Sequence, residues 1–141
     1  MPYTHEDIQD IIMNYHWMHK ELNRLALLLN AVESVGVASY SDEPKNFNGG
    51  PSRRVEAEVI RRDRDYNRMK KYAERVNFIA VHSEAITDER EQAVLACLLD
   101  GMGIQAISRH MNMNRRMIYE LRDSIANKME LDARLVQKEQ K

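Results

Sequence analysis

An asparagine followed directly by two arginines is the part of this sequence best suited to hydrogen bonding with another molecule. Asn114 immediately precedes Arg115 and Arg116. Asparagine is a favourable N-cap residue, so a helix is expected to begin here with two guanidinium groups in its first turn. Guanidinium groups form bidentate hydrogen bonds with guanine in the major groove. The polar cap and the paired arginines therefore predict a helix whose start contacts base pairs.

The expected DNA contacts fall into two groups along this helix, which is predicted over residues 114–128. The first turns of such a helix face base edges in the major groove. The predicted base readers are Asn114, Arg115, Arg116, Tyr119 and Glu120. Other basic side chains are placed to hold phosphates, which position a protein without specifying sequence. The predicted phosphate contacts are Arg109, His110, Arg122 and Lys128. The alternative is a solvated surface helix that carries arginines without contacting DNA.

The spacing of apolar residues predicts a second helix just upstream, joined to the first by a tight turn. Asn112 tolerates the left-handed conformation in which helices often end. Met113 is apolar and is expected to fill the gap between the two helices. The apolar sides of the two helices are marked by Ile104, Ile107 and Met111, and by Ile118, Leu121 and Ile125. Helix, tight turn and helix together are the pattern of a helix-turn-helix.

A third helix is predicted before this pair, so that residues 87–129 form a compact three-helix unit. Thr87 or Asp88 can cap its start, and Asp88 with Glu91 three residues later forms an approximate capping box. Asp100 and Gly101 end it, because glycine is the usual residue just past a helix end. Cys97 is the chain's single cysteine and lies in the apolar run VLACLL. We interpret it as a small buried hydrophobic residue rather than a reactive thiol.

The segment TDEREQAVLACLLDGMGIQAISRHMNMNRRMIYELRDSIANKM resembles the DNA-binding region 4 of sigma factors. Ser108 stands where such motifs usually have a small alanine, and Asn112 stands where they usually have glycine. The layout upstream is an apolar helix, an NGGPS loop and a charged helix ending in KKYAERVNFI. This layout is similar to late-gene activators of phages and prophages of Gram-positive bacteria, of the ArpU and RinA kind. The resemblance implies activation of phage late operons together with host RNA polymerase.

The front of the chain carries a strongly periodic apolar stripe, which predicts a long helix from Thr4 to Glu33. Thr4 and Asp7 are expected to cap its start. The stripe follows alternating steps of three and four residues, as in a coiled coil. It consists of Ile8, Ile11, Tyr15, Met18, Leu22, Leu25, Leu29 and Val32. Such a stripe fits either a hairpin with the next helix or a homodimer, and the sequence does not choose between them.

A flexible loop is predicted over 34–52, followed by a charged helix from Arg53 to Val81. The loop prediction rests on the glycine and proline residues around Gly49–Pro51. The expected apolar side of the helix is Val55, Val59, Tyr66, Met69, Ala73, Val76 and Ala80. Its other face mixes charges at helical spacing, for example Arg61 with Asp65. We interpret that face as solvated and self-paired, with a second DNA site as the alternative.

The predicted fold class is all-α, with two long N-terminal helices, as a hairpin or coiled coil, before a C-terminal three-helix unit. The expected segments are an amphipathic helix at 1–33, the loop at 34–52, a central charged helix at 53–85, the DNA-binding domain at 86–130 and a charged tail at 131–141. Formal net charge is only −1. Residues 104–128 nevertheless carry five basic and two acidic side chains, a local excess of positive charge.

No pattern in the sequence indicates an enzyme, a cofactor or a metal site. His16 and His19 have a spacing that could hold a metal, but no third ligand stands near them. His82, Ser83 and Glu84 are adjacent in sequence, which does not give the geometry of a catalytic triad. Without a signal peptide or a long apolar run, we expect a protein of the bacterial host cytoplasm and nucleoid, with no membrane partner.

Two functions fit these observations. The first is a sequence-specific regulator of transcription that binds double-stranded DNA, contacts host RNA polymerase and forms a homodimer if the heptad stripe pairs between chains. The alternative is a DNA-packaging adaptor, like the small terminase subunits of phages, which also combine a helix-turn-helix with oligomerising helices.

Overall fold

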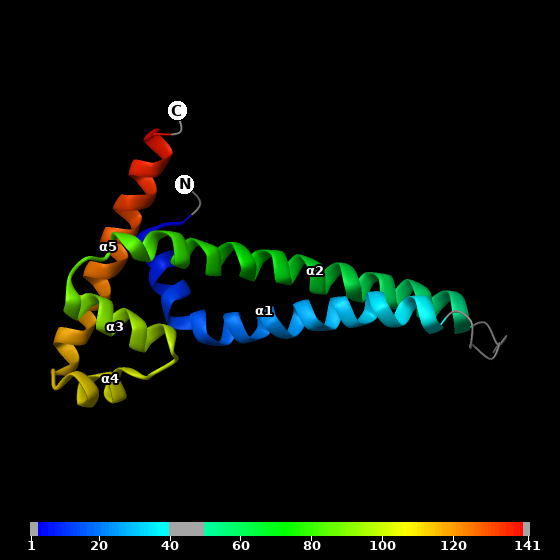
Figure 1. Cartoon of the computed structure of the whole chain (residues 1–141), viewed down its shortest axis with the longest axis horizontal. Helices are drawn as coiled ribbons and strands as arrows, with labels where there is room; N and C mark the ends of the chain where they lie inside the picture. The colour runs from blue at the N-terminus through cyan, green and yellow to red at the C-terminus, as the bar shows by residue number, and fades with distance from the viewer. Residues whose placement is uncertain (1–2, 40–49, 140–141) are drawn as a thin grey trace. The chain divides into compact units, whose positions relative to one another are not determined.

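The described residues are all-helical in the computed structural model, which confirms the all-α part of the predicted fold class (Figure 1). The structure describes residues 3–39 and 50–139, with the side chains of all of these except 31–39 and 50–53. Within these residues the chain forms five α-helices and one short 3₁₀ helix, and no strand. None of the helices described combines the length and the hydropathy needed to cross a membrane.

The first helix, α1 (His5–Ser39), begins where the sequence predicted. The Thr4 amide donates to Asp7 Oδ2 at 3.0 Å, and the Asp7 amide donates to Thr4 Oγ1 at 3.2 Å. This reciprocal pair satisfies amide groups that have no partner inside the helix. The predicted stripe faces inward where side chains are described, with Ile8, Met18 and Leu25 buried.

The predicted loop at 34–52 is wrong at both of its ends. α1 continues to Ser39, and α2 (Gly50–His82) already begins at Gly50. Gly36 alone does not end a helix, since an interior glycine costs only about 1 kcal/mol relative to alanine. Pro51 falls in the first turn of α2, where proline is favourable because its missing amide has no helical partner there. Residues 40–49 lie outside the part of the chain that the structure describes.

The apolar side predicted for α2 is also wrong in its first half. Val55, Val59 and Tyr66 are exposed, whereas Phe78 and Ile79 are buried. The inward-facing positions follow steps of three and four through Met69, Tyr72, Val76 and Ile79, with the first three half-buried. The prediction is correct at Met69, Ala73 and Val76, which are half-buried, but it left out the buried Phe78 and Ile79.

The chain divides into two compact units that are not consecutive in sequence. One unit joins Met1–Met18 to Arg75–Lys141, and the other is His19–Glu74. We call them the bundle unit and the helical hairpin. The long helices α1 and α2 each contribute to both units, so the units divide the chain differently from the predicted segments.

The helical hairpin consists of the second part of α1 and the first part of α2, which runs back antiparallel to it (Figure 1). Glu21 connects the two helices, because it accepts hydrogen bonds from Arg24 at 2.5 Å and from Arg68 at 3.3 Å. The bond from Arg24, with the positive charges of both arginines, lowers the pKa of Glu21. This exposed network holds α1 and α2 together at one point.

The bundle unit contains α3 (Glu89–Leu99), α4 (Ile104–Met111) and α5 (Arg115–Glu139) (Figure 1). Asp88 caps α3 as predicted, since its side chain accepts from the Glu91 amide at 3.1 Å. The core of these helices includes Val94, Leu98, Ile107, Ile118, Ile125 and Met129. Cys97 belongs to this core as predicted, and burial raises the pKa of its thiol.

The predicted charged tail at 131–141 is helical in its described part, because α5 continues to Glu139. No glycine or proline interrupts this stretch. Ala133 is buried, and Asp132 Oδ2 lies 2.7 Å from Nδ1 of His82 at the end of α2. The His82 ring also packs against Phe78 at an interplanar angle of 50°, with ring centroids 4.4 Å apart. Contacts with α2 therefore hold the extension of α5 in helical form.

The turn between α3 and α4 packs against α1. Gly101 ends α3 with a φ of 87°, a left-handed conformation that favours glycine. A Cβ atom at Gly101 would lie 2.7 Å from the imidazole ring of His16. The spacing of His16 and His19 in the sequence could hold a metal, but the structure places the His16 ring against the backbone of Gly101. Within the described residues, no group of three histidine, cysteine or acidic side chains could hold a metal ion.

Candidate nucleic-acid interface

The turn between α4 and α5 is fixed by three polar residues. Asn112 has a φ of 54° and so adopts the predicted left-handed conformation. The Met113 amide donates to the Ser108 carbonyl at 3.0 Å, and the Ser108 hydroxyl donates to the Met113 carbonyl. The Met117 amide donates to the Asn114 side chain at 2.8 Å, which confirms Asn114 as the N-cap of α5. These bonds set the direction in which α5 begins.

The role of Ser108 was not predicted from the sequence. From the sequence, Ser108 was identified only as the residue that replaces the small alanine of related motifs. Its hydroxyl also bonds across the turn to the main chain of Met113. The sequence held a signal for this, because serine and threonine side chains commonly bond to nearby main-chain groups.

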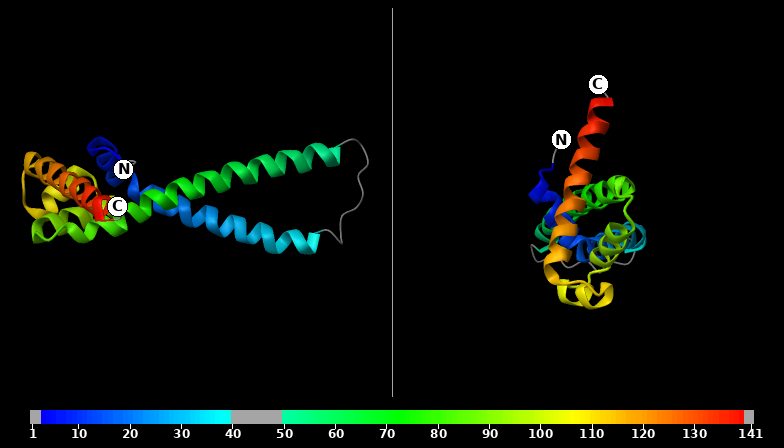
Figure 2. Two further views of the ribbon diagram at one scale, coloured as in Figure 1. Left: turned by 90° about the horizontal axis from the view of Figure 1, so that it is seen from above. Right: turned by 90° about the vertical axis from the view of Figure 1, so that its left-hand side faces the viewer.

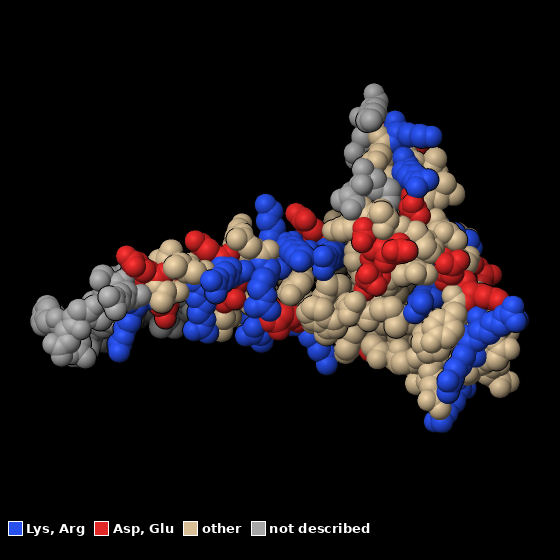
Figure 3. Space-filling model, turned by 180° about the vertical axis from the view of Figure 1, so that it is seen from behind, with Lys and Arg blue, Asp and Glu red and all other residues tan. Residues whose placement is uncertain are grey.

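Burial along α5 separates an inner face from an outer face near its start. Ile118 and Ile125 are fully buried, and Leu121 is half-buried. All five predicted base readers are exposed: Asn114, Arg115, Arg116, Tyr119 and Glu120. Figure 3 shows basic side chains gathered at the corner of the molecule where α4 and the start of α5 lie. The start of α5 therefore presents its polar side chains to solvent.

Arg116 and Glu120 form an ion pair on this outer face, with 3.3 Å between Arg116 Nε and Glu120 Oε1. The Arg116 side chain is 88% exposed. Pairs this exposed contribute little to stability, so either side chain is free to exchange its partner for another polar group. Arg115 lies in the same turn and is exposed as well.

Arg122 is half-buried, whereas a side chain that only contacts phosphate is expected to be exposed. Its guanidinium lies 5.1 Å from the centroid of the Tyr119 ring and donates from Nη1 to Met13 Sδ at 3.3 Å. Its Nε is buried without a hydrogen-bond partner among the described residues. Arg122 therefore connects the outer face of α5 to α1 and holds the Tyr119 ring from one side.

Lys128 is paired with a carboxylate. Its Nζ donates to Glu91 Oε1 at 2.5 Å, and the Ser124 hydroxyl donates to the same oxygen at 3.4 Å. The Glu91 side chain is only 8% exposed, whereas that of Lys128 is 42% exposed. The sequence predicted Glu91 as part of a capping box, but its carboxylate points toward α5. The pair joins α3 to α5, which gives Lys128 a structural partner that the sequence did not indicate.

Arg109 and His110 lie in the last turn of α4, and both are exposed. Basic side chains at this end of a helix complement the negative end of its dipole. They precede the turn by only a few residues, so both lie close in sequence to the first turn of α5. Of the four predicted phosphate contacts, Lys128 has an ion-paired carboxylate among the described residues, and Arg109, His110 and Arg122 do not. Arg109 and His110 are exposed, whereas Arg122 is half-buried.

The start of α1 lies beside α5, a contact that no pattern in the sequence predicted (Figure 2). His5 Nε2 is 2.8 Å from Asp123 Oδ1, and the side-chain Nε2 of Gln9 donates to the same oxygen at 3.3 Å. These contacts join residues more than one hundred positions apart. Such tertiary contacts have no local pattern in the sequence. Both bonds end on the carboxylate of Asp123, which lies one helical turn after Tyr119 on α5.

Comparison with known proteins gives one relative. The chain is 30% identical over 132 residues to the uncharacterized protein YqaQ of Bacillus subtilis strain 168. The match covers 88% of this chain and 87% of YqaQ. No family model matches the chain, and no solved structure matches it.

Proposed function

The chain belongs to the family of YqaQ from Bacillus subtilis, and we propose that it is a sequence-specific DNA-binding regulator of transcription. In this proposal, α4 and α5 form a helix-turn-helix, and α5 is its recognition helix. The first two turns of α5 enter the major groove of double-stranded DNA. The protein acts by binding and needs no catalytic group or cofactor.

The observation that carries the proposal is the exposed arginine pair in the first turn of a helix whose start is fixed. Asn114 caps α5, Asn112 reverses the chain before it, and Ile118 anchors the helix on the core. Arg115 and Arg116 then face solvent from a rigid position. A recognition helix needs this combination, because base readout depends on side chains held at one angle to the groove.

The proposed contacts follow the environment of each side chain. Asn114, Arg115, Arg116, Tyr119 and Glu120 are the base readers, with arginine donating to guanine. Arg109 and His110 hold phosphates at the end of α4, since both are exposed. Arg122 Nη1 already donates to Met13, and its guanidinium lies over the Tyr119 ring. Arg122 therefore contacts a phosphate only through its remaining N–H groups. Lys128 serves mainly to pair Glu91.

The resemblance to sigma region 4 extends the proposal to partners. We propose that the protein activates late genes of a phage or prophage and does so together with host RNA polymerase. The exposed acidic residue Glu89, at the start of α3, is one surface suited to a basic region of the polymerase. Its negative charge also complements the dipole of α3.

A second candidate function, a DNA-packaging adaptor, depends on self-association, and the far end of α5 offers a surface for it. Leu131 and Leu135 are 58% and 51% exposed, and they lie one helical turn apart. Large exposed apolar side chains often mark contacts with other chains. Self-association here is compatible with a homodimeric regulator and with a ring-forming DNA-packaging adaptor. Sedimentation of the purified chain separates the two, because rings favour the adaptor and a monomer or dimer favours the regulator.

The substitution Arg115→Ala tests the assignment of base readers. It should weaken binding to a preferred duplex by about 1–3 kcal/mol and relax the preference at one base pair. The matched control is Arg90→Ala, which removes an equal charge from an exposed position on α3. Affinities for the preferred duplex and for its single-base variants are compared by fluorescence anisotropy. An equal loss for both variants on every duplex would contradict base reading by Arg115.

A further inference from the structure

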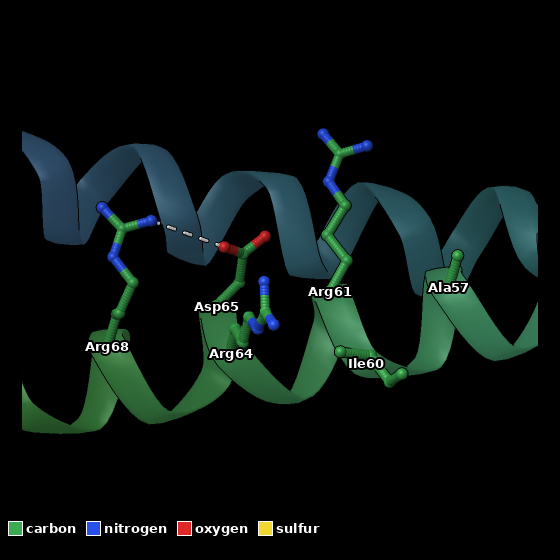
Figure 4. A pocket seen from close by; sticks show the side chains of 6 residues that line it. All are labelled: Ala57, Ile60, Arg61, Arg64, Asp65 and Arg68. Atoms are coloured by element: carbon green, nitrogen blue, oxygen red, sulfur yellow. Dashed lines mark ion pairs between the residues drawn. The ribbon is translucent and has the colours of Figure 1, made fainter.

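A shallow groove on α2 within the helical hairpin gathers arginines on one side of the helix (Figure 4). It is lined by Ala57, Ile60, Arg61, Arg64, Asp65 and Arg68. These positions recur at helical spacing, so they share one face of α2. Figure 4 shows the arginine side chains extending from that face, with an ion pair drawn only between Arg68 and Asp65.

The residues that line the groove carry more positive than negative charge. Three of them are arginines and one is an aspartate, so three minus one gives an excess of +2. The expected pair between Arg61 and Asp65 is not formed, because Asp65 contacts Arg68 at 3.6 Å. Among the described residues, no carboxylate lies within ion-pair distance of Arg61 or Arg64. The face is therefore self-paired only at Asp65 and Arg68, and Arg68 also contacts Glu21 at 3.3 Å.

The chemistry of the groove fits a chain of phosphates. Arg61, Arg64 and Arg68 span seven residues of helix, which is about 10 Å along its axis. Each nucleic acid strand carries one phosphate per nucleotide, so a row of guanidinium groups about 10 Å long can reach more than one phosphate of a strand. Ala57 and Ile60 give the groove an apolar floor against which sugar carbons can pack. Guanidinium groups bind phosphate oxygens in bidentate fashion.

We propose that this arginine groove binds the sugar–phosphate backbone of nucleic acid and gives the protein a second, sequence-independent contact. A membrane surface fits less well, because a membrane-binding helix sets a broad apolar face beside its basic residues. The groove has only Ala57 and Ile60 as apolar lining. The inference does not rest on base reading by α5, since the hairpin can hold phosphates whatever α5 does.

The test compares two double variants of the full chain. Arg61→Ala with Arg64→Ala removes the two unpaired guanidinium groups from the groove. Arg62→Ala with Lys70→Ala is the control, because it removes the same charge from positions turned about 100° and 180° away from Arg61. Alanine is the best helix former, so all four changes should leave α2 intact, and circular dichroism checks this.

Binding to a fluorescent duplex of random sequence is measured by anisotropy over a series of salt concentrations. The groove variant should bind more weakly and should lower the slope of log affinity against log salt by about 1.8, which corresponds to two lost phosphate contacts. The control should keep the slope of the unmodified protein. Equal slopes for the two variants, or no loss in the groove variant, would overturn the inference. Groove-dependent binding to phosphatidylserine vesicles without binding to duplex would also overturn it.

The same assay separates this inference from the proposed function. Arg115→Ala with Arg116→Ala should abolish preference among sequences while the salt dependence supplied by α2 remains. A protein that shows no sequence preference, but loses affinity in the groove variant, refutes the regulator and supports the groove. A protein that prefers one sequence, with a groove variant identical to the unmodified protein, supports the regulator and refutes the groove.

Discussion

Three small polar side chains, Ser108, Asn112 and Asn114, decide how α5 is presented to solvent. Each bonds or bends the main chain within a few residues of itself. Asn112 and Asn114 could be predicted from sequence because their effects are local and depend on residue type. Glu91 could not be predicted fully, because its carboxylate bonds to Lys128, which lies 37 residues away. For the same reason, the sequence did not predict that Lys128 pairs with a carboxylate.

The pair of Glu91 and Lys128 leads to a prediction about stability. Lys128→Ala leaves a nearly buried carboxylate without its cation and should lower the free energy of unfolding by about 1–3 kcal/mol. Specific DNA affinity of the folded protein should change little. Urea denaturation and anisotropy measure the two quantities, and Lys138→Ala, at an exposed site near the end of α5, is the control.

A second substitution makes this prediction sharper. Glu91→Gln combined with Lys128→Ala removes the buried charge and should recover part of the lost stability. Unchanged stability in Lys128→Ala, together with weaker binding to every duplex, would instead identify Lys128 as a phosphate contact.

At the scale of whole elements, the starts of helices were predicted more reliably than their ends. Thr4, Asp88 and Asn114 cap α1, α3 and α5 as the sequence indicated. The ends of α1 and α5 extend beyond the predicted boundaries, because no strong helix-breaking residue is present there and, for α5, packing against His82 supports the extension. Packing between elements has no local signature in sequence, so the contact of α1 with the turn at Gly101 was not predicted.

That contact gives a prediction about how α1 packs in the bundle unit. Gly101→Ala places a Cβ atom 2.7 Å from the His16 ring and also strains a left-handed residue with a φ of 87°. The strain alone should cost about 1–2 kcal/mol, and the overpacking should add about 1–3 kcal/mol. Thermal or urea unfolding measures the total loss.

The double variant Gly101→Ala, His16→Ala separates these two terms. It removes the ring that the new methyl group meets, so the double variant should lose less stability than the two single changes added together. Additive losses would mean that His16 does not touch Gly101, and the proposed packing of α1 on this turn would be incorrect.

At the scale of the whole molecule, one of the two compact units is built from two segments that are separate in sequence. The helical hairpin, His19–Glu74, is inserted between the two parts of the bundle unit. Its boundaries fall inside the continuous helices α1 and α2, where the composition does not change and no glycine or proline marks a break. The predicted segments end at turns and loops, and their boundaries therefore differ from those of the compact units, which lie within helices.

Charge is distributed unevenly over these units, although the formal net charge is only −1. Residues 61–71 of the hairpin carry an excess of six basic over two acidic side chains, and residues 104–128 of the bundle unit carry five against two. A protein with little net charge can bind DNA through such local concentrations, and its affinity then depends strongly on salt. In this account, α5 supplies sequence preference and α2 adds affinity without preference.

The most direct test of the account is selection of bound fragments from a random DNA pool by the purified full chain. The unmodified protein should enrich one short motif, and the Arg115→Ala, Arg116→Ala variant should lose that enrichment while remaining folded by circular dichroism. Enrichment of the same motif by both proteins, or of none by the unmodified protein, would contradict the claim that α5 reads DNA sequence.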